Sequence, residues 1–262
     1  MTSIREPAVA GLFYPQTPGV LSDMVQGFLA EDAAGAGSPK GIIVPHAGYV
    51  YSGSIAGTAY RLFEEDRATI SRIVLIGPSH RVGFHGLAVS SADYFSTPLG
   101  RIAIDRISVD GLTSMPQVRV MDEAHDSEHS LEVQLPFLQL VLEEFSLVPL
   151  VAGDASAGDV SEVIDQMWGG DETRFVISSD LSHYHDYSTA KRMDRATCHA
   201  IETFDGASIG FGDACGRVPI TGFLESAKRR GLYARLLDLR NSGDTAGSKD
   251  QVVGYAAFRF DT

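Results

Sequence analysis

Short β-branched runs alternate along this chain with segments of helical periodicity, and that alternation restricts the fold more than any other feature of the sequence. Buried strands are predicted at residues 42–44, 72–76, 147–151 and 175–177, where apolar residues run together. Helical spacing places two further sets of side chains each on one helical face: Ile55, Ala59, Leu62 and Phe63, and Leu131, Leu135, Leu138 and Leu142. The sequence therefore predicts an α/β fold.

A different pattern at residues 87–105 predicts that part of the sheet is antiparallel, because a turn precedes a short alternating strand there. Two segments rich in glycine and small polar residues, 34–41 and 241–250, are predicted to be loops. The second separates the last helical region from a terminal strand. Pro149 lies between apolar stretches and need not divide domains. We expect one domain over residues 1–262, with a mixed sheet flanked by helices.

The charge balance excludes some classes of partner. Lysine and arginine number 21 against 34 aspartate and glutamate, a formal net charge of -13 at pH 7, which argues against binding to nucleic acid or to an anionic membrane. No apolar run has the character of a signal peptide or a membrane span. The two cysteines, Cys198 and Cys215, are too few for a disulfide framework, so we expect a reducing, cytoplasmic location.

Histidines follow three of the predicted strands, accompanied after the third by an aspartate. His46 comes after the strand at 42–44, His80 after the strand at 72–76, and Asp180, His183 and His185 after the strand at 175–177. In open α/β sheets, ligands bind outside the carboxyl ends of the strands. If these strands are parallel neighbours, their histidines meet in one crevice, which favours a functional site over three separate structural histidines.

Such a cluster of imidazoles is most stable when the rings are neutral and share a metal ion. A metal site also needs an anionic ligand, and the best candidate is Cys215, which is predicted to lie in a loop before a helix. Gly216 would let the backbone approach closely there. Cys198 falls in a helical run and is predicted to be an ordinary buried residue.

Three other local patterns compete with this interpretation. His125 to His129 fit the H-x-x-E-H motif of inverted zinc peptidases, with Glu128 as the base, but so short a pattern arises easily by chance in a chain with 8 histidines. The run from Gly77 to His80 resembles a nucleophile elbow, yet Arg81 replaces the final glycine that the tight turn needs. Neither a Walker nor a dinucleotide-binding glycine pattern is present.

Five motifs, in order and over nearly the whole chain, resemble the Memo family: VPHAGYVYSG, IGPSH, EHSLEVQLPF, ISSDLSHY and CGRVPI. The opening REPAVAGLFYP is also similar to that of bacterial and archaeal members, which are often labelled AmmeMemoRadiSam system protein B. The resemblance implies a fold like that of the class III extradiol dioxygenases, the non-haem iron enzymes that cleave catechol rings.

The resemblance also implies the ligands of a mononuclear metal site, which are His46, His80 and Cys215 by their motifs. Asp180, His183 and His129 then line the same pocket, while His125 matches no family motif. Tyr49 and Tyr51 are expected either to wall the pocket or to be ordinary half-buried aromatics. The cysteine departs from the two-histidine, one-carboxylate set of most non-haem iron oxygenases, because a thiolate is softer and can itself be oxidised.

These observations lead to two hypotheses about function. The first is a non-haem iron, dioxygenase-like or redox-active enzyme that acts on a small hydroxylated aromatic substrate, with Fe(II) favoured and copper or zinc as alternatives. In it, His183 moves a proton and Asp180 orients a neighbouring group. The second is a non-catalytic scaffold that binds a peptide or handles a metal, as the signalling and redox-regulating roles of animal Memo relatives suggest. The substrate and the oligomeric state are not indicated by the sequence.

Overall fold

The computed structural model describes residues 2–30 and 37–262, and it confirms the predicted α/β fold with a mixed sheet. Part of the predicted loop at 34–41, residues 34–36, lies outside the described residues. The strands are β1 (Ile4–Arg5), β2 (Gly41–Val44), β3 (Arg72–Pro78), β4 (Leu87–Val89), β5 (Tyr94–Thr97), β6 (Gly100–Ile104), β7 (Val118–Val120), β8 (Ser146–Ala152), β9 (Thr173–Ser178), β10 (His183–His185), β11 (Tyr233–Asn241) and β12 (Val252–Asp261). The α-helices are α1 (Pro18–Leu29), α2 (Tyr49–Tyr60), α3 (Arg106–Leu112), α4 (Glu123–Asp126), α5 (Leu135–Val141), α6 (Ala157–Gln166), α7 (Tyr187–Glu202) and α8 (Arg217–Arg229).

The centre of the sheet is parallel, and antiparallel pairs occur toward its margins. Strands β8, β3, β9 and β2 lie side by side in that order and run in the same direction. Strand β12 continues the sheet antiparallel to β2, and β10 and β11 pair with β12. Toward the other margin, β5 and β6 pair antiparallel, which confirms the prediction that part of the sheet at residues 87–105 is antiparallel. All four predicted strands are therefore confirmed, and the histidine-bearing ones are direct neighbours.

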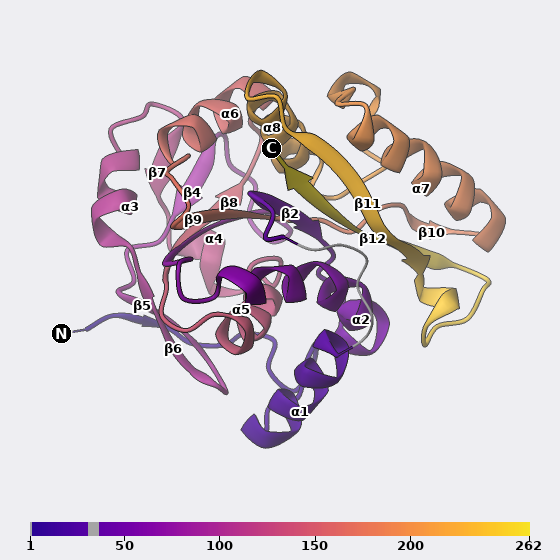
Figure 1. Ribbon diagram of the computed structural model, residues 1–262, viewed down its shortest axis with the longest axis horizontal. Coiled ribbons are helices and arrows are strands. Elements are labelled where there is room, and N and C mark those ends of the chain that lie inside the picture. Colours follow the sequence, from indigo (N-terminus) through magenta and orange to yellow (C-terminus); the bar gives the residue numbers. More distant parts are fainter. Residues whose placement is uncertain (1, 31–36) are drawn as a thin grey trace.

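Burial explains why the central strands form as they do. Every residue of β2 and of β9 is buried, because helices cover both faces of a parallel sheet. Figure 1 shows α1, α2 and α5 on one side of the sheet and α6, α7 and α8 on the other. The leucines of the predicted helical face at 131–142 are buried as expected, although the first turn of that segment is a 3₁₀ helix, η2 (Glu132–Gln134).

The structure corrects two predictions about strands. The last helical region is not followed directly by the loop at 241–250, because β11 lies between them. In addition, His183 and His185 do not extend the strand at 175–177; they belong to β10, a separate short strand antiparallel to β12.

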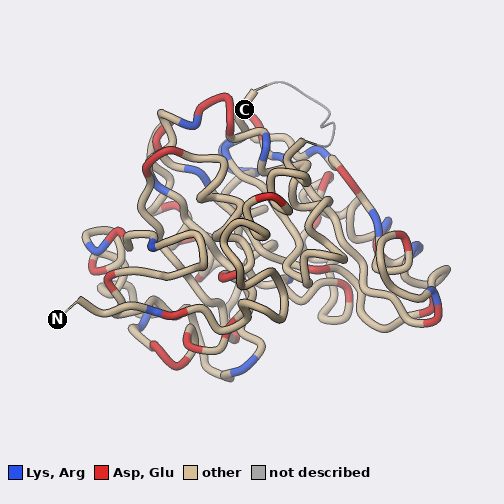
Figure 2. The backbone as a smooth tube through the Cα atoms, turned by 90° about the horizontal axis from the view of Figure 1, so that it is seen from below, with Lys and Arg blue, Asp and Glu red and all other residues tan. Residues whose placement is uncertain are grey.

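Figure 2 shows lysine and arginine positions scattered among the more numerous acidic ones.

Candidate functional site

The parallel order of three strands brings the predicted residues together at one edge of the sheet. Val44, near the end of β2, pairs with Ser178 at the end of β9, and β9 pairs on its other side with β3. His46 and His80 each follow their strand by two residues. Because the carboxyl ends of parallel neighbours meet at the same edge, these side chains share one crevice.

Three possible ligand atoms converge in that crevice. One atom each from His46, His80 and Cys215 lies within 4.8 Å of the other two. Cys215 Sγ is 3.2 Å from His46 Nε2, and the two imidazole rings meet edge to face at 5.1 Å. His46 is buried whereas His80 is exposed, so the group is held in the protein on one side and is accessible to solvent on the other.

Hydrogen bonds around His46 determine which ring nitrogen faces the cysteine. His46 Nδ1 lies 2.8 Å from Ser178 Oγ, and that hydroxyl donates to the carbonyl of Ser130 at 2.6 Å. Gln134 Nε2 also donates to Ser178 Oγ, at 2.9 Å. Since the single hydroxyl proton goes to Ser130, the bond to His46 is made by an Nδ1–H donor. This tautomer leaves the lone pair of Nε2 directed at Cys215.

The carboxylate of Glu128 determines which ring nitrogen of His80 is free. Glu128 Oε1 accepts from His80 Nδ1 at 2.9 Å, and Oε2 accepts from the main-chain N–H of His80 at 2.6 Å. Burial alone would raise the pKa of Glu128, but hydrogen bonds and the charge of His80 outweigh it and hold the pKa at about 2. The ionised Glu128 thus fixes both the backbone and the ring of His80, and it leaves Nε2 of the ring free to bind a metal ion.

The loop that carries Cys215 is fixed to the end of β9. The main-chain N–H of Cys215 donates to the carbonyl of Asp180 at 3.3 Å, and the N–H of Asp180 donates back to Cys215 Sγ at 3.3 Å. Gly216 is needed for this approach, since a Cβ there would lie 2.5 Å from the Cβ of Ser179. Burial, with the nearby Asp180 carboxyl, raises the pKa of the Cys215 thiol to about 12.

Asp180 holds the main chain of the site. Its Oδ1 accepts from the N–H of His46 at 2.7 Å. The side chain is buried, and burial raises the pKa of Asp180 to about 7 in spite of the hydrogen bonds it accepts. This carboxyl therefore joins the ends of β2 and β9.

Two further histidines surround the group. The ring of His129 stacks on that of His80, with ring centroids 4.6 Å apart, and also contacts the ring of Phe13 at 4.7 Å. Its Nδ1 is buried without a hydrogen-bond partner, and burial lowers the pKa of His129 to about 4. His183 lies within electrostatic range of His46 and His80, and burial lowers its pKa as well. His46 itself has a pKa well below the ordinary value because of burial and these neighbouring rings.

The two predicted tyrosines lie differently. Tyr49 is buried, packs against Tyr14, Phe28 and Phe137, and donates its hydroxyl to the carbonyl of Val133 at 2.7 Å. The structure thus places Tyr49 in the hydrophobic core and not beside the histidines. Tyr51 is 38% exposed on the same helix, α2.

The competing motifs do not form the sites they suggest. Helix α4 ends at Asp126, so His125 and His129 do not share one helical face. His125 is buried elsewhere, with Nε2 3.2 Å from the carbonyl of Ala88. Ser79 donates its hydroxyl to the carbonyl of Val82 at 2.6 Å, which is a turn contact and not that of an activated nucleophile.

Sequence reasoning missed the residues that orient the two imidazoles, which are Glu128, Ser178 and Gln134. The sequence indicates Glu128 only as the base of a peptidase motif. Ser178 lies in the ISSDLSHY motif and Gln134 in EHSLEVQLPF, but neither motif by itself indicates what these two residues do. A polar residue within a motif that is otherwise buried, close in sequence to a candidate ligand, is the signal that could find them.

In the part of the chain that the structure describes, no helix is long and apolar enough to cross a membrane. The sequence model of the family described as Memo-like protein matches residues 5–259. Relatives named MEMO1 family protein include one from Aquifex aeolicus, 36% identical over 98% of this chain and 99% of its own length. Another, from Thermoplasma acidophilum, is 35% identical over 97% of each chain, and a third, from Methanosarcina barkeri, is 35% identical over 97% and 98%. The chain therefore belongs to the Memo family.

Proposed function

We propose that this protein binds one transition metal ion through His46, His80 and Cys215. The observation that carries the proposal is the convergence of these three ligand atoms within 4.8 Å, with both Nδ1 atoms engaged elsewhere. Two neutral imidazoles and one thiolate suit Fe(II), copper or zinc. Metal binding would remove the thiol proton that burial otherwise retains. We favour Fe(II) because of the resemblance to the extradiol dioxygenases.

We further propose a dioxygenase-like or redox reaction on a small hydroxylated aromatic substrate. Bound Fe(II) would supply the oxygen chemistry. The protein supplies orientation, since Glu128 and Ser178 fix the tautomers of the two imidazoles. His183, which lies within electrostatic range of His46 and His80, would accept a proton from a substrate hydroxyl and later return it. Asp180 holds the His46 backbone in place.

Metal analysis tests the first proposal. Protein purified without added metal is expected to contain about one transition metal ion per chain. Alanine at position 46, 80 or 215 should sharply lower that content. Cys198→Ala is the matched control, because Cys198 is the second free cysteine and lies buried in helix α7. Full occupancy in Cys215→Ala would contradict the proposal and would transfer the anionic role to a carboxylate such as Asp180 or Glu128.

Oxygen consumption tests the second proposal. The iron-loaded protein, given a panel of catechols, is expected to consume oxygen in proportion to substrate. A metal-bound protein that consumes none with any member of the panel would instead support the non-catalytic scaffold. Keeping the two measurements separate means that the metal site can stand while the reaction fails.

A further inference from the structure

A small cavity adjoins the candidate metal ligands. Its volume is about 210 Å³, and its walls include Cys215 and Ser79, the residue directly before His80. The other walls come from the end of β8, at Ala152, and from the start of α8, at Val218. A molecule in this cavity would therefore lie beside the sulfur that we assign to the metal.

Most of the lining of the cavity is apolar and suits an aromatic ring. Pro78, Val82, Phe84, Ala152 and Val218 contribute to its walls, and the one carboxylate among the lining residues, Asp154, pairs with His85 at 3.0 Å. The hydroxyl of Ser79 is already engaged by the carbonyl of Val82, so it adds little polarity. An apolar cavity of roughly 150 Å³ is enough to bind benzene. The space here fits one aromatic ring but not a nucleotide or a folded peptide.

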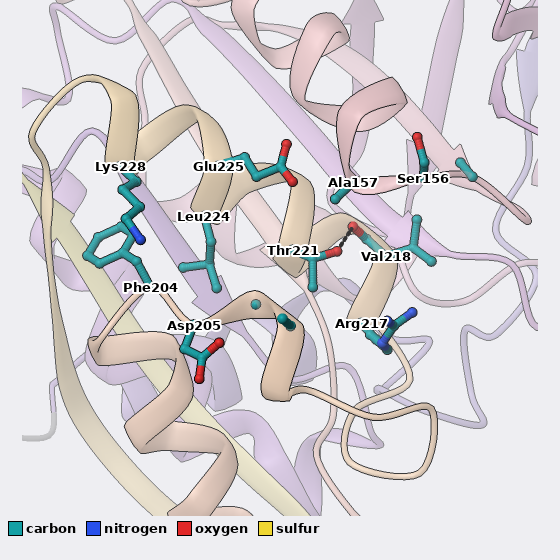
Figure 3. Close-up of a pocket in the computed structure, with 13 residues that line it drawn as sticks. Ser156, Ala157, Phe204, Asp205, Arg217, Val218, Thr221, Leu224, Glu225 and Lys228 are labelled. Atoms are coloured by element: carbon teal, nitrogen blue, oxygen red, sulfur yellow. Dashed lines mark hydrogen bonds between the residues drawn. The ribbon is translucent and has the colours of Figure 1, made fainter.

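A second hollow, of about 500 Å³, shares Val218 with the cavity and is lined by residues along α8 (Figure 3). Arg217 lines it next to Val218, whereas Asp205, Glu225 and Lys228 lie on the far side of Thr221 in this view. The guanidinium of Arg217 stacks over Phe211 at 4.4 Å, and within residues 2–30 and 37–262 its hydrogen bonding is limited to Nε, which donates to the carbonyl of Ile209. Among the described residues, no carboxylate forms an ion pair with Arg217.

We propose that the cavity binds the ring of a single-ring aromatic acid and that Arg217 binds its carboxylate across Val218. Guanidinium and carboxylate groups form paired, charge-assisted hydrogen bonds. A local cation is also what a protein with a net charge of -13 needs in order to hold an anion. The proposal names the substrate class of the reaction proposed above and depends on that function for turnover, but not for binding.

Four variants test the binding site. Gly83 lines the cavity, and a Cβ added there meets nothing within 4 Å, so Gly83→Leu can reduce the cavity without a clash. Val218→Phe narrows the shared wall, and Arg217→Gln removes the cation while keeping a long polar side chain. Gly111→Leu is the matched control, since Gly111 also has nothing within 4 Å of an added Cβ and lies in α3.

Binding of 4-hydroxyphenylacetate and of phenol is measured by calorimetry on the protein as purified, without oxygen, so that no turnover occurs. We expect the acid to bind at least tenfold more tightly than phenol. Arg217→Gln should abolish that difference, and Gly83→Leu and Val218→Phe should weaken both ligands about tenfold or more. Gly111→Leu should bind as the unaltered protein does, and circular dichroism should report the same fold in all four variants.

Two results would overturn the inference: equal affinity for acid and phenol in the unaltered protein, or binding that neither cavity-filling variant changes. Oxygen uptake in air separates this outcome from failure of the proposed function. Binding that follows the expected pattern without any oxygen uptake leaves the site in place and refutes the reaction. Oxygen uptake with unchanged binding in Gly83→Leu and Val218→Phe leaves the reaction in place and refutes the site.

Discussion

The close approach of Gly216 to strand β9 yields a sharp prediction. The perturbation is Gly216→Ala, which adds one methyl group next to the proposed ligand Cys215. That carbon would lie 2.5 Å from the Cβ and 2.7 Å from the Oγ of Ser179, and 2.7 Å from the carbonyl oxygen of Ser178. Carbon atoms that are not bonded normally sit about 3.5–4.0 Å apart. The loop must therefore move away from β9 by roughly 1 Å.

The magnitude follows from that displacement. Overpacking of this kind typically costs about 1–3 kcal/mol. Metal–ligand distances must hold within about 0.2 Å, so a shift of this size removes Cys215 from coordinating range of the two imidazoles. If this cost is subtracted from the free energy of metal binding, metal affinity falls by about 10- to 100-fold, because each factor of ten in affinity corresponds to about 1.4 kcal/mol.

The assay is a competition titration of the metal against a chromogenic chelator, with thermal unfolding measured in parallel. Gly212→Ala is the control, because Gly212 precedes Cys215 on the same loop and an added Cβ there meets nothing within 4 Å. It should bind metal as the unaltered protein does. Unchanged metal affinity in Gly216→Ala would refute the reasoning, because the position of Cys215 Sγ would then not depend on the close approach of Gly216 to Ser179.

Glu128→Gln is expected to lower metal affinity about 10- to 100-fold, because an amide cannot accept all three N–H groups that Glu128 now receives from His80 and Ser130; chelator competition measures this. His183→Ala should retain metal and lose most turnover, about 10²-fold or more, with a smaller loss in Asp180→Asn; loss of metal would instead make His183 a ligand. In metal-free protein, burial lowers the pKa of His125 from 6.5 to about 4. The folded state therefore binds fewer protons there, and stability should fall between pH 6.5 and 4 by up to about 3 kcal/mol from this residue alone. His125→Asn should reduce that slope in urea titrations and leave metal affinity unchanged.

The central strands could be predicted because burial on both faces makes their sequences continuously apolar. Strand β11 could not, because it lies at the margin of the sheet and carries Arg235, Asp238 and Arg240 on a surface that is largely half-buried. Strand β10 has only three residues, and Tyr184 within it has a left-handed backbone with φ of 60°. No alternation can be recognised over so short and irregular a strand.

The convergence of His46 and His80 could be anticipated because parallel strands end at the same edge of a sheet. Cys215 is the best remaining anionic candidate in the sequence and the resemblance supports it, but a single cysteine in a loop gives no signal of its position in the fold. The hydrogen-bond partners of the histidines were beyond sequence reasoning for a different reason. Ser178 and Glu128 reach them from β9 and from the segment before η2, and only the assembled fold brings those segments together.

Glu128 illustrates how one local pattern can serve two different chemistries. In the peptidase interpretation of H-x-x-E-H, this glutamate is a general base, which requires a free oxygen and a pKa near the working pH. Here both oxygens accept N–H groups, and the pKa is held at about 2. A carboxylate with these properties is a poor base but a good anchor for an imidazole. If Glu128 were the base of a peptidase, Glu128→Gln would keep its metal and lose peptide hydrolysis. If Glu128 anchors the imidazole of His80, the same substitution lowers the metal affinity. Metal affinity in this one variant therefore separates the two roles.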